Sequence, residues 1–302
     1  MVESAPAARH ADGAPASPLG RLLADPSLTV FRGRYYLYPT TDGIEDWASD
    51  GFSVFSSADL VSWQEHGEVL RLGTDVAWAS GHAWAPAAVE RHGRHYLYFT
   101  ADQDNIGVAV ADSPTGPFTD LGRPLIAAGD FAARAIDPSV LVDGEQTYLY
   151  WGNGAAHGAP LNADLTSFDP AQVRTFHPVD FREAAFVHRR GDTYYLSWSV
   201  DDTRHADYHL RYATGPSPLG PWTDRGVLLE KQPARDILAT GHHSIINVPG
   251  TDDWVIAYHR FAIPGGDGCH REIVFDRLVH RPDGLLEPVI PAPEPLRLPL
   301  NP

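Results

Sequence analysis

Short runs of apolar and aromatic residues alternate along the chain with clusters of Gly, Pro, Asp and Ser. The runs are rich in Val, Tyr, Phe, Trp and Thr, and such runs bounded by turn-forming residues predict β-strands. Long stretches with the 3.6-residue periodicity of an amphipathic helix are hard to find. The pattern therefore predicts an all-β protein.

One unit recurs along the chain. A polar residue opens an apolar strand, a glycine turn follows, and an aromatic strand comes next. In the first copy, Asp25-Pro26-Ser27-Leu28 leads to Gly33 and then to Tyr35-Tyr36-Leu37-Tyr38. The copies lie 46 to 60 residues apart and begin at Asp25, Ala85, Asp137, Glu183 and His242.

A second unit follows the first in three copies, with an aromatic residue four positions before a glycine. The pairs are Trp63 and Gly67, Phe118 and Gly122, and Trp222 and Gly226. Together the units predict about four strands per repeat, and four-stranded sheets recurring at this period are typical of β-propeller blades. A β-sandwich also has regularly spaced short strands, but it does not explain the repeated register. We therefore expect a single five-bladed β-propeller domain over residues 21–302.

Residues 1–20 are rich in Ala, Pro, Ser and Gly, and we expect them to form a disordered leader. They lack the apolar centre of a secretory signal, and no stretch of the chain reaches membrane-spanning length. This predicts a cytoplasmic protein, or a secreted one if an export signal has been removed. The single cysteine, Cys269, excludes an internal disulfide and a cysteine zinc site.

The chain is acidic, with 39 Asp and Glu against 23 Lys and Arg and a formal net charge of −16. Such a surface repels phosphate backbones and anionic lipids, so neither nucleic acid nor a membrane is an expected partner. The 8 Trp and 12 Tyr suit sugar binding, because aromatic faces stack on the C–H faces of sugar rings, although a β-rich core also needs them. No feature of the sequence indicates an oligomeric state.

The first strand of every propeller blade lines the central axis, so the residues that open the repeats should converge there. Three of them are acids, Asp25, Asp137 and Glu183, and one is a histidine, His242. Ordinary Asp-Pro-Ser turns explain the two aspartates but not Glu183. Acids clustered in a cleft suit either a hard cation or glycoside hydrolysis, which needs a proton donor and an opposing base or nucleophile. Two acids with a third that tunes their pKa fit hydrolysis better.

Six short motifs occur in a fixed order between about Leu22 and Pro291, and with them the chain resembles glycoside hydrolase family 43. They are Asp25-Pro26-Ser27, Trp84-Ala85-Pro86, Ile136-Asp137-Pro138-Ser139, Glu183 before a Gly-Asp-Thr-Tyr-Tyr-Leu hairpin, Gly241-His242-His243-Ser244 and Tyr258-His259-Arg260.

The resemblance implies an inverting glycosidase of the arabinofuranosidase, xylosidase or arabinanase type, and it implies roles for individual residues. Asp25 matches the general base that activates water, and Glu183 matches the general acid. Asp137 matches a third acid that orients Glu183 and raises its pKa. His242 matches an axial histidine that helps to hold a hydrated calcium ion, and Arg271 matches a substrate-binding arginine.

Some residues depart from the family pattern or have two interpretations. The acid is followed by Ala184-Ala185, where the family often has Gly-Pro. Trp84 and Trp151 are candidate platforms for sugar stacking, and either could instead belong to the core. Trp47 is either a platform or part of a solvated loop, and His82 either reaches the pocket or lies on the surface.

We expect an exo-acting, inverting enzyme that releases terminal α-L-arabinofuranose or β-D-xylose from oligosaccharides derived from plant polysaccharides. Release of terminal galactose on the same scaffold is an alternative, and a non-catalytic sugar-binding propeller is another. A lectin has no need of all three acids. A retaining fructosidase would carry a Glu-Cys pair where this chain has Glu183-Ala184.

Overall fold

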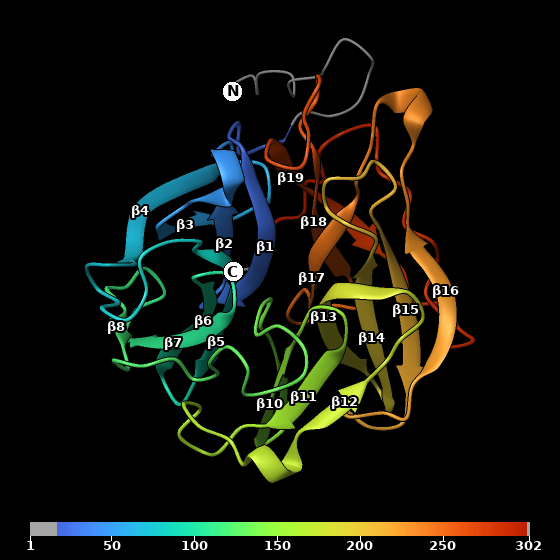
Figure 1. The fold of residues 1–302 in the computed structure, drawn as a ribbon. Coiled ribbons are helices and arrows are strands. Elements are labelled where there is room, and N and C mark those ends of the chain that lie inside the picture. The colour runs from blue at the N-terminus through green and yellow to red at the C-terminus, as the bar shows by residue number, and fades with distance from the viewer. Residues whose placement is uncertain (1–16, 301–302) are drawn as a thin grey trace.

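Five antiparallel sheets are arranged around a central axis in the computed structural model, which describes residues 17–300 (Figure 1). Four of the described sheets have four strands and one has three, and within each sheet the strands are hydrogen-bonded in chain order. Each sheet is one blade. The predicted single-domain, five-bladed β-propeller is therefore confirmed.

The strands of the blades follow one another along the chain. Blade one contains β1 (Leu23–Phe31), β2 (Arg34–Thr41), β3 (Gly51–Ser57) and β4 (Trp63–Arg71). Blade two contains β5 (Trp84–Arg91), β6 (Arg94–Ala101), β7 (Asn105–Ala111) and β8 (Thr119–Asp120). Blade three contains β9 (Ser139–Asp143), β10 (Gln146–Trp151), β11 (Ala156–Pro160) and β12 (Arg174–Phe176). Blade four contains β13 (Phe181–Arg190), β14 (Thr193–Val200), β15 (His209–Gly215) and β16 (Thr223–Leu229), and blade five contains β17 (Gly241–Asn247), β18 (Trp254–Phe261) and β19 (Arg271–Leu278).

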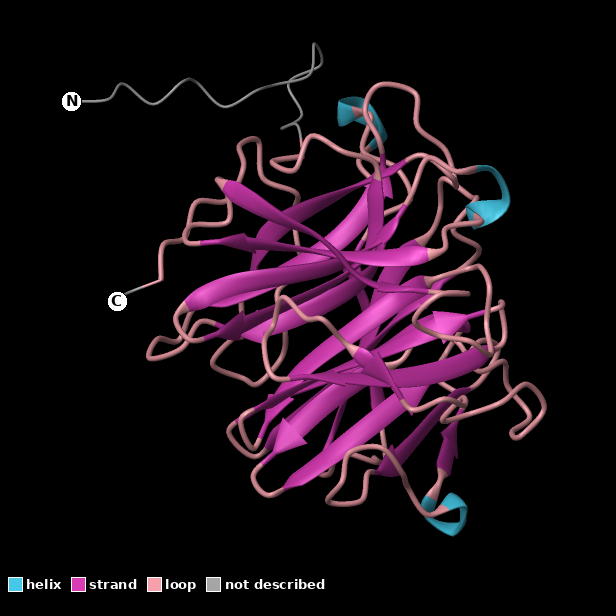
Figure 2. Ribbon diagram, turned by 90° about the vertical axis from the view of Figure 1, so that its left-hand side faces the viewer, coloured by secondary structure: helices cyan, strands magenta, loops and turns pink. Residues whose placement is uncertain are grey.

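The helices of the described chain are three short 3-10 turns at the edges of the molecule (Figure 2). They are η1 (Glu45–Trp47), η2 (Pro170–Gln172) and η3 (Pro233–Arg235). Within residues 17–300, no helix has the length and apolar character needed to cross a bilayer.

The glycine turns and aromatic strands predicted from the repeat lie where expected. Gly33 adopts φ 72° in the turn between β1 and β2, and Gly144 adopts φ 60° in the turn between β9 and β10. These conformations suit glycine because it has no Cβ. The aromatic second strands then run back through the middle of each blade, where most of their side chains are buried.

Buried tyrosines on the second strands join each blade to the next. Their hydroxyl groups donate to backbone carbonyl oxygens of the following blade, in the pairs Tyr38 and Pro114 (2.5 Å), Tyr98 and Leu165 (2.5 Å), and Tyr150 and Pro218 (2.8 Å). A buried hydroxyl needs such a partner. Much of the aromatic content of the chain therefore stabilises contacts between blades rather than binding ligand.

Both ends of the described chain close the ring between blades five and one. The Ser17 hydroxyl donates to the Ile273 carbonyl oxygen of β19 at 2.7 Å, and Leu19 packs on the core between these blades. The Leu298 amide donates to the Asp59 carbonyl oxygen. Residues 17–20, expected in a disordered leader, thus belong to the propeller. The rest of that predicted leader, residues 1–16, lies outside the described residues.

Candidate active site

Each blade has a residue in the left-handed conformation at or near the start of its inner strand. These residues are Asp25 (φ 49°), Ala85 (φ 43°), Asp137 (φ 57°), Ala184 (φ 58°) and His242 (φ 37°). Residues other than glycine hold this conformation at a cost, and it persists where the surroundings enforce it. Here amide groups donate to side chains of the preceding blade, from Asp25 to His259, from Asp137 to Thr100 and from His242 to Ser199.

The structure corrects the register expected for Glu183. The left-handed residue of blade four is Ala184, so Glu183 lies one position earlier and corresponds to Trp84 of blade two. The Ala184 amide donates to the Asp137 carboxyl group. The corresponding amides of Asp137 and His242 donate to hydroxyl groups instead. Glu183 still lines the same cavity as Asp25 and Asp137. The three acids therefore converge as expected, although by two different backbone positions.

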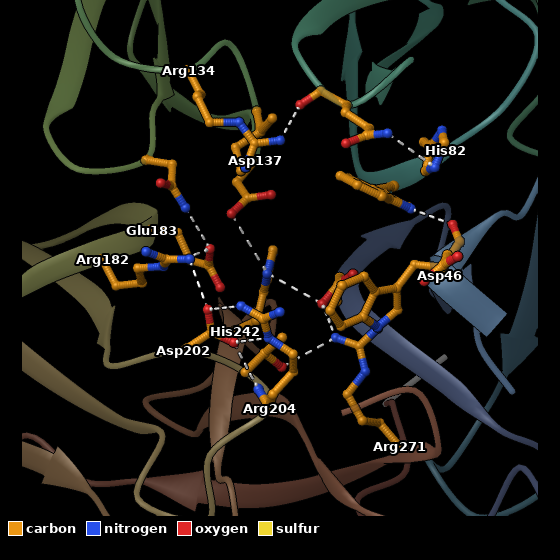
Figure 3. A pocket seen from close by; sticks show the side chains of 17 residues that line it. Asp46, His82, Arg134, Asp137, Arg182, Glu183, Asp202, Arg204, His242 and Arg271 are labelled. Atoms are coloured by element: carbon orange, nitrogen blue, oxygen red, sulfur yellow. Dashed lines mark hydrogen bonds and ion pairs between the residues drawn. The ribbon is translucent and has the colours of Figure 1, made fainter. Parts of the chain in front are cut away.

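The acids line a cavity of about 590 Å³ at one end of the central axis (Figure 3). All five blades or the loops between them contribute to its wall. The lining residues are Asp25, Asp46, Trp47, His82, Trp84, Gln103, Arg134, Ile136, Asp137, Asn153, Arg182, Glu183, Asp202, Thr203, Arg204, His242 and Arg271. This volume is typical of a small-molecule site, and most of the lining side chains are polar or charged.

Asp25 is surrounded by basic groups. Its Oδ1 lies 3.1 Å from His259 Nδ1, 3.2 Å from His242 Nδ1 and 3.3 Å from Arg271 Nη1. Burial alone would raise the pKa of this carboxyl, but His242, Arg271 and His259 hold the pKa well below its ordinary value. Because burial also lowers the pKa of both histidines, Arg271 carries the positive charge at neutral pH. Asp25 is therefore ionised.

Glu183 has a different environment. Its Oε1 accepts a hydrogen bond from the Tyr208 hydroxyl at 2.9 Å, and its Oε2 accepts one from Asn153 Nδ2 at 2.8 Å. Burial raises the pKa of Glu183, and the charges of Asp25 and Asp202 raise it further, against the opposing effects of Tyr208 and Arg182. A carboxyl with a raised pKa beside one with a lowered pKa is the arrangement expected of an acid and a base.

Like that of Glu183 and unlike that of Asp25, the pKa of Asp137 is raised. Burial raises its pKa well above the ordinary value, and the charges of Glu183 and Asp25 add to this effect. Its Oδ2 is buried without a hydrogen-bond partner among the described residues and lies 4.0 Å from His242 Nδ1. Its other contact is the Ala184 amide. Asp137 and Glu183 thus raise the energy of one another's ionised forms.

The side chains around His242 bear on the predicted calcium ion. His242 Nδ1 faces Asp25 and Asp137, and burial lowers the pKa of the ring, which keeps it neutral. Within the described residues, no group of three or more His, Cys, Asp or Glu side chains could hold a metal ion. Calcium prefers six to eight oxygen ligands. The side chains form no calcium cage, so an ion here would take most of its ligands from water.

Two tryptophans and a histidine form one side of the cavity mouth. Trp84 Nε1 donates to the Trp47 carbonyl oxygen at 2.7 Å, and the two rings meet edge to face with centroids 6.4 Å apart. His82 also packs edge to face on Trp84, at 5.1 Å. Trp47 and His82 thus belong to the pocket rather than to a solvated loop or surface. Trp84 is placed where a sugar ring could stack on it.

Trp151 is not at the site, and its predicted role as a sugar platform is wrong. The side chain is completely buried and packs on Phe131, His157 and Phe168 in the core between blades two and three. The reason is its place at the end of β10, whose alternation turns the ring outward from the axis. Trp84 keeps its predicted place because it opens an inner strand.

Arg271 lines the cavity as predicted, but its guanidinium group is largely engaged by protein carboxylates. Its Nε and Nη2 bind Asp42 at 2.9 and 3.0 Å, and its Nη1 reaches Asp25. Only Nη1 is left near the cavity, with Thr203 Oγ1 at 3.4 Å. The clearest function of Arg271 is therefore to fix and ionise Asp25.

Sequence reasoning missed several residues that complete the site. Tyr208 and Asn153 hold Glu183, and Asp42 holds Arg271. Asp42 and Arg271 are 229 positions apart, and no local pattern links them. The sequence motifs did contain two residues of the site: His259 in Tyr258-His259-Arg260 and Gly241 in Gly241-His242-His243-Ser244. The structure explains the glycine, because a Cβ at Gly241 would lie 2.1 Å from the Tyr208 ring.

Comparison with known proteins supports the same conclusion as the geometry. The chain is 30% identical over 285 residues to a β-D-galactofuranosidase of Aspergillus niger, covering 88% of this chain and 82% of the relative. It is 32% identical over 327 residues to xylosidase/arabinosidase 43A of Humicola insolens, covering 86% and 94%.

A solved structure is also similar over nearly its whole length. It is a family 43 β-xylosidase/α-arabinofuranosidase from a compost microbial metagenome, in complex with xylotriose and in a calcium-free form. The two chains are 30% identical, the match covers 90% of this chain and 96% of that one, and the TM-score is 0.77. The model of glycosyl hydrolases family 43 matches residues 17–286, a range that contains all three acids and every other residue that lines the cavity. With the predicted motifs, the propeller and the acid triad all in agreement, the chain belongs to glycosyl hydrolases family 43.

Proposed function

We propose that this glycosidase is an inverting, exo-acting enzyme that releases terminal α-L-arabinofuranose or β-D-xylose from oligosaccharides. The observation that carries the proposal is the opposite perturbation of two carboxyl groups in one cavity. Basic neighbours lower the pKa of Asp25, whereas burial raises the pKa of Glu183. Inversion needs both states at once, a carboxylate that activates water and a carboxylic acid that protonates the leaving oxygen.

Asp25 is the general base in this proposal. His242, His259 and Arg271 all approach its Oδ1, and its Oδ2 has no hydrogen-bond partner among the described residues. The lone pairs of Oδ2 can therefore accept a proton from a water molecule on one face of the sugar. The three basic neighbours fix the orientation of the carboxylate, which keeps the attacking water in line with the anomeric carbon.

Glu183 is the general acid, and Asp137 supports it. Tyr208 and Asn153 fix both Glu183 oxygens, so the proton is presented from a defined position. When the glycosidic bond breaks, Glu183 gives its proton to the departing oxygen. Asp137 is a neighbouring carboxyl whose own pKa burial raises, and it disfavours simultaneous ionisation of the two groups. Burial and the negative charges of Asp25 and Asp202 raise the pKa of Glu183. The resulting raised pKa gives a proton donor suited to the working pH.

The Trp84 and Trp47 wall supports the binding of a terminal sugar. The named relatives divide between xylosidase/arabinosidase and galactofuranosidase activities. Terminal β-D-galactofuranose is therefore the second candidate for the released sugar. A panel of 4-nitrophenyl α-L-arabinofuranoside, β-D-xyloside and β-D-galactofuranoside distinguishes them. Failure on all three, together with tight binding of an oligosaccharide, would instead support a non-catalytic sugar-binding propeller.

A hydrated calcium ion near His242 is a further part of the proposal. The similar solved structure from the compost metagenome is a calcium-free form of a family 43 enzyme, and this supports measuring the calcium content of the present protein. The ion would supply local positive charge, with His242 as its one direct protein neighbour. Elemental analysis of protein dialysed without chelator should give about one equivalent of calcium for a single site. A value near zero would leave His242 as a partner of Asp25 alone.

A further inference from the structure

Three arginines line the cavity, with Arg182 beside Glu183 and with Arg134 and Arg204 at opposite ends of the view in Figure 3. Arg182 Nη2 lies 2.8 Å from Asp202 Oδ2, and Arg204 Nε lies 2.7 Å from Asp202 Oδ1. One carboxylate thus serves two guanidinium groups. Arg134 Nη2 donates to the Gln103 carbonyl oxygen at 2.6 Å and has no carboxylate partner among the described residues. When Glu183 is protonated as the acid, Asp202 is the one ionised carboxylate that forms ion pairs with these three arginines among the described residues, so positive charge is in local excess.

Arg182 lies on the side of the cavity where the leaving group must sit, and Arg204 is joined to it through Asp202. Arg182 directly precedes Glu183, and its Nε is 3.8 Å from Glu183 Oε2. A general acid contacts the glycosidic oxygen, so the sugar that departs extends past this residue. The side chains of Arg182 and Arg204 are 40% and 62% exposed, which leaves them accessible to a ligand. Asp46, the other carboxylate at the mouth, lies across the cavity from Arg182 (Figure 3).

We propose that the leaving-group side of the cavity binds a carboxylate-bearing sugar, so that the preferred substrates are acidic oligosaccharides with a uronic acid next to the released residue. Arginine binds carboxylates through paired, charge-assisted hydrogen bonds. Neutral hydroxyl groups would not require the excess charge. The inference rests on the proposed function, because Glu183 as the acid defines the leaving-group side.

The acidic surface of the protein does not prevent this recognition. The formal net charge of −16 repels anions at long range. Salt screens that field over a Debye length of about 8 Å at physiological ionic strength. A carboxylate within hydrogen-bonding distance of Arg134 or Arg204 experiences those groups far more strongly than distant surface acids. The positive charge of the arginines in the cavity, rather than the net charge of the protein, therefore decides whether an acidic substrate is preferred to a neutral one.

A matched pair of substrates tests the inference. Each carries the terminal sugar accepted in the aryl glycoside panel, linked either to glucuronic acid or to glucuronic acid methyl ester. The pair differs in charge but hardly in the leaving oxygen. At about 20 mM salt, kcat/KM for the acid should exceed that for the ester by about tenfold, because charge-assisted hydrogen bonds are the strong ones. The ratio should fall toward one at about 500 mM salt.

Variants assign the preference to the arginines. Arg134→Gln and Arg204→Gln should each lower the acid-to-ester ratio several-fold, and Arg134→Lys should retain part of it. Arg94→Gln is the control. Arg94 is 56% exposed at the first residue of β6, whereas the cavity lies beyond the last residue of that strand, so this variant should leave the acid-to-ester ratio unchanged. Using a ratio removes any general loss of activity from the comparison.

Two outcomes would overturn the inference: equal kcat/KM for acid and ester at low salt, or a ratio that the Arg134 and Arg204 variants do not alter. Failure of the proposed function is distinguishable, because then no aryl glycoside is hydrolysed. Calorimetry on the Glu183→Gln variant then supplies a test without turnover. The acid should bind about tenfold more tightly than the ester. Equal affinities would refute acidic recognition whatever the enzymatic result.

Discussion

Replacing Tyr208 with phenylalanine should raise the pKa of the catalytic acid while leaving the fold intact. The Tyr208 hydroxyl donates to Glu183 Oε1 at 2.9 Å, and this bond favours the ionised carboxylate. A hydrogen bond to a charged group contributes about 1.5–3 kcal/mol, and one pKa unit corresponds to about 1.36 kcal/mol. Losing the bond should therefore raise the pKa of Glu183 by about 1–2 units.

The pH dependence of kcat/KM measures this change, because Glu183 must be protonated to act. The alkaline limb of the profile should move to higher pH by about 1–2 units. The phenylalanine ring keeps the stacking of Tyr208 on His259, whose ring centroids are 5.6 Å apart. Tyr194→Phe is the matched control, since Tyr194 lies in β14 of the same blade as Tyr208 but donates to Asp143 Oδ2 of blade three, away from the cavity. An unmoved alkaline limb, or one that moves to lower pH, would refute the assignment of Glu183 as the acid held by Tyr208.

Further substitutions test the remaining parts of the site. Asp25→Asn and Glu183→Gln should each lower kcat by about 10²–10⁴-fold on an oligosaccharide, and Asp25→Asn should also lower the melting temperature because the basic groups around Oδ1 lose their counter-charge. Asp137→Asn should raise the melting temperature, and more at pH 8 than at pH 5: a folded-state pKa above the unfolded value destabilises the protein increasingly as pH rises toward that folded pKa. Trp84→Ala should raise KM without lowering the melting temperature much, whereas Trp151→Ala should cost about 3–5 kcal/mol of unfolding free energy with little change in KM in the protein that still folds; equal effects of the two in both assays would contradict the different positions assigned to them.

The repeat in the sequence was sufficient to predict the propeller, because one register recurs in every blade. Asp25, Asp137 and Glu183 were found by that register, and the structure brings all three to one cavity. The register itself was wrong by one residue at Glu183. The pairing of β13 with β14 shifts register between Glu183 and Phe186, and Ala184 is the left-handed residue there. The sequence pattern cannot reveal this irregularity, because Ala184 and Ala185 are as apolar as the strand residues that follow.

The parts of the site that were missed depend on contacts between distant segments. Asp42 and Arg271 meet through the closure of the ring between blades five and one, and Tyr208 reaches Glu183 from the loop between β14 and β15. The error at Trp151 has a related cause. An aromatic residue near an active-site strand has the same sequence signature whether its ring faces the axis or the neighbouring blade, and only packing distinguishes the two.

The stereochemistry of the product tests the central claim most directly, because it distinguishes Asp25 as a base from Asp25 as a nucleophile. An inverting pair leaves room for water, with carboxyl groups about 6.5–9.5 Å apart, whereas a retaining pair stands about 5–5.5 Å apart. Proton NMR within the first minutes of hydrolysis, before mutarotation, should show a sugar of inverted anomeric configuration. Reactions in the presence of methanol should give essentially no methyl glycoside. Methyl glycoside of retained configuration would contradict the account and assign Asp25 the role of a nucleophile.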